Sequence, residues 1–192
     1  MFCYIIRHGK DDDTVRGGWS DAPLTACGCT ETERLAEQLA RIQNIKKIYS
    51  SDLKRAVQTA QIIDKQMNCG IEYISGFREV NNGRLAGMKN SEAELKYPDL
   101  YWRKMDWNEN YPEGESPRDF FFRVKSAWKS FSKKIIADGE DVLLVTHGGV
   151  ISVVLSIING EKYSNKIQTK SLAQMQVLSL EYQNGKWSVK NH

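Results

Sequence analysis

Two of the three histidines in this chain occupy equivalent places, each between a short apolar run and a glycine: His8 before Gly9, and His147 before Gly148. A neutral imidazole can act as a nucleophile, and a charged one can bind an anion. Arg7 sets a fork of five donors beside His8, which suits a phosphate or a carboxylate. Glycine lets the backbone pass close to a ligand, and backbone N–H groups at a helix start attract anions. These residue types together predict an anion pocket that contains a nucleophile.

The apolar runs before these histidines, Phe2–Ile6 and Val142–Val145, are rich in isoleucine and valine. Such runs are typical of buried central strands in a parallel sheet, and open α/β sheets bind ligands at the carboxyl ends of their strands. We therefore expect the two histidines to face each other across one pocket, with Gly148 and Gly149 both presenting backbone N–H groups to it. The third histidine, His192, is expected in a solvated tail.

Strand and helix patterns alternate through the first part of the chain. A capping-box spacing at Thr30–Glu33 predicts the start of a helix, and residues 45–49 read as a short strand. Ser51–Asp52 is expected to cap a second helix, and a third strand is predicted at residues 71–74. This alternation favours right-handed crossovers and a largely parallel sheet.

Regular patterns return in the last third of the chain. Ser116–Pro117 predicts an N-cap and a first-turn proline for a helix that runs to about Ala137. An apolar helix is expected at residues 150–158, and residues 173–182 and 186–189, joined by Asn-Gly, predict a hairpin at the sheet edge. The expected fold is a three-layer α/β/α arrangement with a mostly parallel central sheet, an edge hairpin and a cap insertion.

The segment at about residues 77–115 breaks the alternation, because it holds several glycines and prolines and no clean strand. Its many aromatic residues argue against a disordered insert. They favour a partly helical cap folded over the pocket. Residues 1–192 are therefore predicted to form a single domain with this cap-like insertion.

Composition excludes several classes of function. The chain is 41% hydrophobic and 27% charged, as in ordinary soluble proteins, and its net charge of +3 comes without a lysine tract that would predict a nucleic-acid partner. No apolar run approaches the roughly 18 residues of a membrane span, and no signal segment is evident, so a cytoplasmic location is expected. Cys27 and Cys29 are the only close cysteine pair, which favours plain thiols over a metal or redox site, and no metal or cofactor is expected.

Further motifs join those around the two histidines. In chain order they are Arg7-His8-Gly9, Pro23-Leu24-Thr25, Ser50–Ala60, Arg78-Glu79, Gly114-Glu115-Ser116 and Thr146–Gly149. This order resembles that of the histidine phosphatase superfamily, and the chain is similar to its phosphoglycerate mutase-like branch. The resemblance extends from residue 4 to about residue 152, and the joint order makes it far more specific than a lone Arg-His-Gly.

The resemblance implies that His8 attacks phosphorus and becomes a phosphohistidine. It implies that Arg7, Arg55 and His147 bind the phosphoryl oxygens and that Glu79 donates the proton. Guanidinium groups keep a nearby imidazole neutral by lowering its pKa, and preorganised cations stabilise phosphoryl charge without a metal. A bound phosphate dianion favours the charged form of the second histidine. The same dianion raises the pKa of the glutamic acid, which can then protonate the leaving alkoxide and later activate water.

Each of these residues also has a structural interpretation. Arg55 alone would read as a solvated arginine on an amphipathic helix, and Glu79 as an ordinary loop acid. His147 could be a buried histidine satisfied by hydrogen bonds. The presence of all the motifs together favours the catalytic interpretation.

The chain departs from the family pattern after Gly9. Members usually continue with Glu or Gln, then Thr, then an Asn a few residues on, whereas this chain has Lys10 followed by Asp11, Asp12 and Asp13. Lys10 would add a cation, while the aspartates would oppose a highly charged substrate, and the sequence leaves open which of them points inward. A second departure, at residues 83–87, leaves Glu79 intact and affects only the packing of the cap.

We therefore predict a metal-independent phosphatase that hydrolyses a small-molecule phosphate monoester through a phosphohistidine on His8. The alternatives are a phosphotransferase of the phosphoglycerate mutase type and a non-catalytic module that binds phosphorylated ligands. The short chain and its aromatic cap resemble the phosphatases of the branch, including those acting on α-ribazole phosphate, and predict a partly apolar or aromatic ester. An exposed edge at the terminal hairpin could pair two copies into a homodimer.

Overall fold

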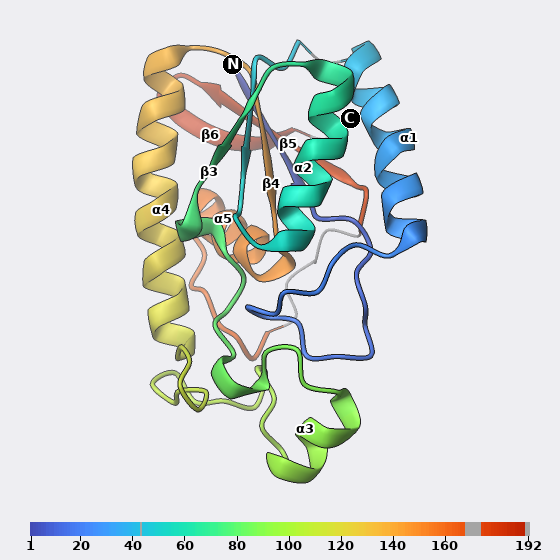
Figure 1. Ribbon diagram of the computed structural model, residues 1–192. Coiled ribbons are helices and arrows are strands. Elements are labelled where there is room, and N and C mark those ends of the chain that lie inside the picture. The colour runs from blue at the N-terminus through green and yellow to red at the C-terminus, as the bar shows by residue number, and fades with distance from the viewer. Residues whose placement is uncertain (43, 168–173, 191–192) are drawn as a thin grey trace.

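A computed structural model describes residues 1–42, 44–167 and 174–190 (Figure 1). Within these residues the strands form one sheet in the order β3-β2-β4-β1-β5-β6. The strands are β1 (Phe2–Arg7), β2 (Lys47–Ser50), β3 (Ile71–Tyr73), β4 (Val142–Thr146), β5 (Val177–Gln183) and β6 (Lys186–Lys190). Strands β1 to β4 run parallel to one another, whereas β5 pairs antiparallel with β1 and β6 pairs antiparallel with β5 at one edge. The predicted mostly parallel sheet with an edge hairpin is confirmed.

The register of the two central strands sets the two predicted histidines side by side. β1 and β4 are parallel neighbours in which Arg7 lies opposite Thr146. The backbone N–H of His8 donates to the carbonyl oxygen of Thr146 at 2.9 Å. Both strands therefore end at the same level of the sheet, and the residue after each end is a histidine.

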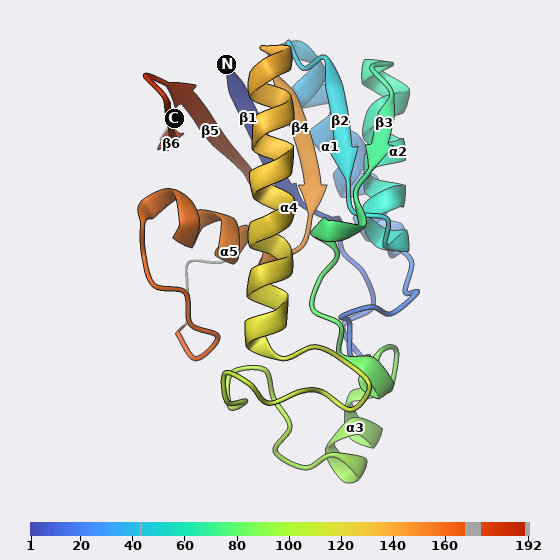
Figure 2. The same ribbon diagram turned by 90° about the vertical axis from the view of Figure 1, so that its left-hand side faces the viewer.

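Helices cover both faces of the sheet (Figures 1 and 2). Helices α1 (Ala26–Ile42) and α2 (Lys54–Met67) lie on one face, and α4 (Pro117–Asp138) and α5 (Gly148–Asn159) lie on the other. Alternate residues of β1 point to opposite faces, so that Ile5 packs with α4 and α5 while Ile6 packs with α1 and α2. Burying each such side chain stabilises the fold by about 1.5–3 kcal/mol. The three layers predicted from the sequence are present.

Two of the predicted helix starts are wrong in detail. Helix α1 begins at Ala26 rather than at Thr30, because the hydroxyl of Thr25 accepts the backbone N–H of Gly28 at 3.0 Å and caps the helix there. Thr32, which the capping-box prediction placed in the first turn, is buried inside the helix and donates to the carbonyl oxygen of Gly28.

The start of α2 also differs from the prediction. Its N-cap is Leu53, and no side chain caps the helix. Ser51 instead contacts His147 through its hydroxyl, and Asp52 forms a two-pronged ion pair with Arg78, with both N···O distances 2.6 Å. The hydroxyl of Ser51 therefore faces the residue that follows β4, and the carboxylate of Asp52 is paired with Arg78.

The predicted start of α4 and the terminal hairpin are confirmed. Ser116 caps α4 by accepting the backbone N–H of Asp119 at 3.1 Å, with a proline in the first turn. Asn184 and Gly185 have φ angles of 53° and 78°, the left-handed pair that a tight hairpin turn needs. The predicted first strand of the hairpin began at residue 173, which, like His192, lies outside the described residues.

The cap segment, residues 77–115, lies beyond the carboxyl ends of the parallel strands (Figure 2). It follows the short helix η1 (Ser75–Phe77) and contains η2 (Gly83–Leu85) and α3 (Asn90–Lys96). A small core of Leu85, Met105 and Tyr111 orders it, and Trp102 stacks on Tyr111 with ring centroids 6.3 Å apart. Part of the aromatic content that we predicted for substrate contact thus packs inside the cap. None of the described helices combines the length and apolar character needed to cross a membrane.

Candidate active site

The carboxyl ends of β1 and β4 bring the two predicted histidines together. Their ring centroids are 5.1 Å apart, and the exposed fractions of His8 and His147 are 3% and 0%. Arg55, from the first turn of α2, contacts His8, and Glu79, from the cap segment, contacts the first turn of α5. Residues far apart in the sequence thus form one buried site.

The ring of His8 is held from both sides by partners whose roles are fixed. Its Nδ1 lies 2.8 Å from the carbonyl oxygen of Gly9, and its Nε2 lies 3.1 Å from Nε of Arg55. A carbonyl oxygen can only accept and a guanidinium N–H can only donate. His8 therefore carries its proton on Nδ1, and Nε2 keeps a lone pair that faces the pocket cation.

Burial and nearby charge keep this imidazole neutral. Desolvation is the largest cause, followed by the guanidinium of Arg55, and together they lower the pKa of His8 to about 3. The hydrogen bond to Gly9 opposes the shift, and Arg7 adds to it. At neutral pH the unprotonated, nucleophilic form is the populated one.

The ring of His147 has a different environment. Its Nε2 lies 2.8 Å from the hydroxyl of Ser51, which also accepts the backbone N–H of Leu53 at 3.3 Å. Burial, and after it the electrostatic interactions with His8 and with the nearby guanidinium groups, lower the pKa of His147 well below its usual value. We predicted that His147 works best when charged, so it must gain its proton when an anion binds.

Arg55 is not a solvated arginine on the surface of an amphipathic helix, because its exposed fraction is only 2%. Besides its bond to His8, its Nη2 donates to the carbonyl oxygen of Gly18 at 2.7 Å, and its Nη1 contacts Ser20 at 3.4 Å. The preceding residue, Lys54, has a side chain that is 44% exposed. Of the two adjacent cations on this helix, only Arg55 is built into the site.

Two nitrogens of the site are buried without a hydrogen-bond partner among the described residues. They are Nε of Arg7 and Nδ1 of His147. A Cβ built on Gly148 would lie 3.9 Å from the same nitrogen of Arg7, so Arg7 lies at the start of α5, the positive end of its helix dipole. Unpaired buried polar groups are costly and call for an explanation. An anion bound between these groups would supply their partner.

Glu79 is held by backbone groups on both carboxylate oxygens. Its Oε2 accepts the N–H of Gly149 at 3.1 Å and its Oε1 accepts the N–H of Val80 at 3.0 Å. A Cβ on Gly149 would lie 2.3 Å from Oε1, so a side chain there would displace the carboxylate. We predicted that Gly149 presents its N–H to the anion, and this is wrong because Glu79 occupies that N–H. Trp19 fixes the same loop by donating its Nε1 to the carbonyl oxygen of Glu79 at 2.7 Å.

Arg123, on α4, is a supporting residue that the sequence analysis missed. Its guanidinium takes part in five hydrogen bonds, two of them to the carboxylate of Glu115 at 2.6 and 2.9 Å. The others go to the carbonyl oxygens of Gly76, Arg78 and Glu79, each at 3.0 Å. Arg123 therefore clamps the loop that carries Glu79. The spacing of eight residues between Glu115 and Arg123, across a helix start, was the only available signal in the sequence.

Gly9 is required by packing. A Cβ there would lie 2.6 Å from the hydroxyl of Thr32 on α1. Its backbone N–H donates to the hydroxyl of Thr59 at 3.0 Å. The contact that excludes a side chain at Gly9 is therefore with α1. The close approach of a ligand to Gly9 stays a prediction.

The loop after Gly9 places one of its aspartates in the site. Oδ2 of Asp11 lies 3.5 Å from Nε of Arg55, and the side chain of Asp11 is 15% exposed. Asp12 turns outward and accepts both the N–H and the hydroxyl of Thr14, at 2.9 and 2.7 Å. Lys10 and Asp13 are exposed. This arrangement resolves which aspartate points inward.

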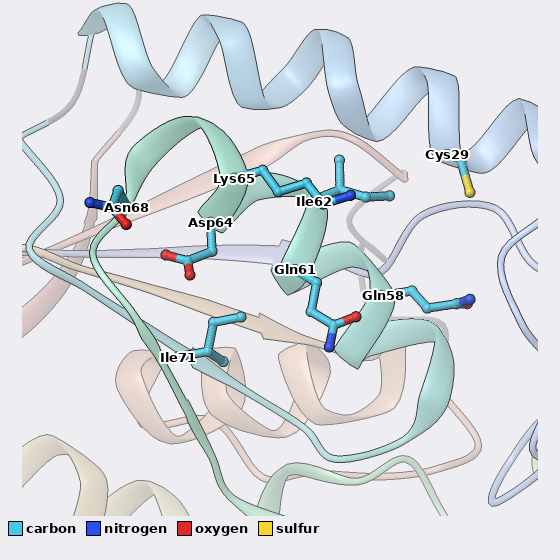
Figure 3. A pocket seen from close by; sticks show the side chains of 8 residues that line it. All are labelled: Cys29, Gln58, Gln61, Ile62, Asp64, Lys65, Asn68 and Ile71. Atoms are coloured by element: carbon cyan, nitrogen blue, oxygen red, sulfur yellow. The ribbon is translucent and has the colours of Figure 1, made fainter.

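A groove of about 570 Å³ lies elsewhere on the surface, between α2, the start of α1 and β3 (Figure 3). None of the predicted site residues lines this groove. Its lining consists of Cys29, Gln58, Gln61, Ile62, Asp64, Lys65, Asn68 and Ile71. Asp64 already accepts the backbone N–H groups of Cys69 and Gly70, at 3.0 and 2.8 Å. The groove is therefore separate from the site at the ends of the strands.

Sequence comparisons place the chain among known proteins. The model of the histidine phosphatase superfamily (branch 1) matches residues 3–192. The chain is 31% identical over 192 residues to a probable phosphoglycerate mutase, GpmB, of Proteus mirabilis strain HI4320, with 96% of this chain and 86% of that protein covered. The GpmB protein of Escherichia coli strain K12 / DH10B is 34% identical over 164 residues, or 82% of this chain and 74% of the relative.

Solved structures show a shared fold. YhfR of Bacillus stearothermophilus matches with a TM-score of 0.84 at 25% identity, covering 98% of this chain and 94% of that one. A mycobacterial glucosyl-3-phosphoglycerate phosphatase matches with a TM-score of 0.81 at 22% identity, covering 98% and 96%. A putative α-ribazole-5′-phosphate phosphatase of Escherichia coli K-12 matches with a TM-score of 0.82 at 20% identity, covering 99% and 94%.

Proposed function

This chain belongs to branch 1 of the histidine phosphatase superfamily and has its phosphoglycerate mutase-like fold, and from that premise we propose that it is a metal-independent phosphatase of small-molecule phosphate monoesters. One observation carries the proposal. The lone pair of Nε2 on the neutral His8 faces the guanidinium of Arg55, beside the nitrogens of Arg7 and His147 that have no partner in the described part of the chain. A nucleophile next to several anion-binding donors suits phosphoryl transfer.

In the first step Nε2 of His8 forms a bond to phosphorus while the bond to the alkoxide of the ester breaks. Glu79, as a carboxylic acid, gives its proton to the leaving oxygen. Arg7, Arg55 and His147 stabilise the negative charge on the phosphoryl oxygens. The bond from Nδ1 of His8 to the carbonyl oxygen of Gly9, 2.8 Å long, stabilises the positive charge that the imidazole ring acquires.

In the second step water attacks phosphorus and the P–N bond breaks. Glu79, now a carboxylate, takes one proton from that water, so the proton lost in the first step is replaced. The electron pair of the broken bond returns to Nε2 of His8, and inorganic phosphate leaves. Arg123 and Trp19 keep Glu79 in place through both steps by holding its backbone carbonyl.

A mutase-type phosphotransferase is the second candidate, because both sequence relatives described above are named probable phosphoglycerate mutases. Two of the solved structures are named phosphatases instead, at identities of 22% and 20%. A mutase must shield its phosphoenzyme from water and return the phosphoryl group to a bound acceptor. A phosphatase needs only to admit water to the same intermediate.

The products distinguish these activities. The purified protein is incubated with 3-phosphoglycerate plus bisphosphoglycerate, and separately with a panel of phosphate monoesters in the presence of a chelator. We expect release of inorganic phosphate that the chelator does not reduce. Rapid isomerisation without phosphate release would establish the mutase, and tight phosphate binding without any turnover would establish a binding module.

A further inference from the structure

Asp11 brings a second carboxylate to the reacting centre, beside that of Glu79. One nitrogen of Arg55 faces both the nucleophile and this carboxylate: its Nε lies 3.1 Å from Nε2 of His8 and 3.5 Å from Oδ2 of Asp11. The side chain of Asp11 is 15% exposed, so water screens it only weakly. A phosphoryl group bonded to Nε2 of His8 would therefore lie close to a carboxylate as well as to cations.

The fixed charges of this pocket balance in the absence of a ligand. Arg55 interacts electrostatically with Arg7, Asp11 and Glu79, so these four residues together hold two guanidinium cations and two carboxylates. The imidazoles add no charge, because the pKa values of His8 and His147 both lie below the usual range. Lys10, in the same loop as Asp11, is exposed to solvent. The pocket is thus less attractive to a highly charged anion than its arginines suggest.

A carboxylate can only accept hydrogen bonds, so an anion placed against it must bring a proton of its own. Phosphate near neutral pH carries at least one hydroxyl group, whereas sulfate, of the same shape, carries none. A fully deprotonated oxygen set against Asp11 meets repulsion with no compensating hydrogen bond. The two anions therefore test the carboxylate directly.

We propose that Asp11 is a specificity-determining residue that accepts a hydrogen bond from a protonated oxygen of the phosphoryl group, and so selects protonated phosphate over fully deprotonated tetrahedral anions. This proposal rests on the proposed function, because it takes the ligand of His8 to be a phosphoryl group. It also gives a role to the Lys10–Asp13 loop, which departs from the family pattern.

The test measures binding of inorganic phosphate and of sulfate by calorimetry at pH 6.0, for the wild type and for D11N, D11T and D13N. Asp13 is in the same loop and is exposed, so D13N makes the same charge change outside the pocket. We expect the wild type and D13N to prefer phosphate by about 100-fold, and D11N and D11T to reduce that preference to about tenfold or less. Melting temperatures of all four proteins show that each is folded.

Three results would overturn the proposal. They are a wild type that binds sulfate as tightly as phosphate, folded Asp11 variants that keep the wild-type preference, and a D13N variant that loses it. The wild-type measurement needs no variant, so the proposal is testable even if both Asp11 substitutions unfold the protein. If the proposed function fails instead, the wild type neither binds phosphate nor becomes phosphorylated on His8, which is a different outcome from a changed preference.

Discussion

The ends of β1 and β4 are alike in sequence and in position, yet they hold their histidines differently. Both ring nitrogens of His8 have partners, Gly9 and Arg55, which fix a lone pair on Nε2. Among the described residues, His147 has one partner, Ser51, and its other nitrogen is buried without one. The chain leaves His8 into an irregular loop and leaves His147 directly into α5. Equivalent positions in a sheet therefore need not mean equivalent roles, because the partners of the ring nitrogens decide the chemistry.

The largest expected difference is between the two histidines themselves. His8→Ala removes the nucleophile and is expected to lower kcat by about 10⁴-fold or more, whereas His147→Ala removes one stabilising donor and is expected to cost about 10²-fold. Steady-state release of phosphate measures both. Equal losses in the two variants would contradict the division of roles.

The next effect concerns the cation that serves His8 directly. Arg55→Gln leaves Nε2 of His8 without its donor and is expected to lower kcat by about 10²- to 10³-fold. Lys54→Gln is the matched control, since Lys54 is the neighbouring residue on α2 and forms an exposed ion pair with Asp21. We expect this control to stay within about twofold of the wild type. A similar loss in both variants would show that positive charge at the start of α2, rather than the contact of Arg55 with His8, supports the activity.

A smaller effect is expected from the clamp on the Glu79 loop. Arg123→Lys keeps the positive charge but loses the planar fork, and is expected to lower kcat by about tenfold with little change in KM. The limb of the pH–rate profile that reports the proton donor should shift, which a change in overall stability alone would not cause. Arg118→Lys, at an exposed position on the same helix, serves as the control. A change in KM without a change in kcat would argue against a positioning role.

A separate effect is on stability, and it follows from the lowered pKa values. His8 and His147 stay neutral in the folded protein well below their usual pKa of 6.5. As pH falls below 6.5 the unfolded chain binds protons that the folded protein does not bind, so the free energy of unfolding decreases, by about 1.4 kcal/mol per pH unit for each histidine. Above pH 6.5 neither histidine contributes a slope.

Denaturant titrations between pH 7.5 and pH 4.5 measure this slope. In the variant His147→Gln, the free energy of unfolding should depend less steeply on pH, by about 1.4 kcal/mol per pH unit, because one titrating histidine is absent. The part of the slope due to ordinary carboxylates is common to both proteins. If the two slopes agree, His147 is not held neutral in the folded protein.

Much of the fold could be predicted because its signals are local. Apolar runs mark the buried strands, and the Asn-Gly pair marks the hairpin turn. The start of α1 was predicted at the wrong residue, since Thr25 and Thr30 both offer capping hydroxyls and only the tertiary structure decides between them. The cap segment had no periodic pattern, because its core is only a few side chains.

The parts of the candidate site that depend on the chemistry of a side chain could be predicted from the sequence. The parts that depend on contacts with the backbone could not. His8, Arg55 and Glu79 belong to recognisable motifs, and the structure brings them to one site. Arg123 acts through main-chain carbonyl groups, which no motif records. The direction of Asp11 depends on the path of an irregular loop, so the sequence alone could not distinguish it from its neighbours.

The central claim is that His8, and not His147, carries the phosphoryl group. The most direct measurement starts by mixing the protein with a phosphate ester that it hydrolyses. The protein is then denatured within milliseconds under conditions that preserve phosphohistidine, and the phosphate is located by peptide mass spectrometry. We predict phosphate on the peptide containing His8 in the wild type and in His147→Ala, and none in His8→Ala. Phosphate on the peptide containing His147, or undiminished turnover in His8→Ala, would contradict the account.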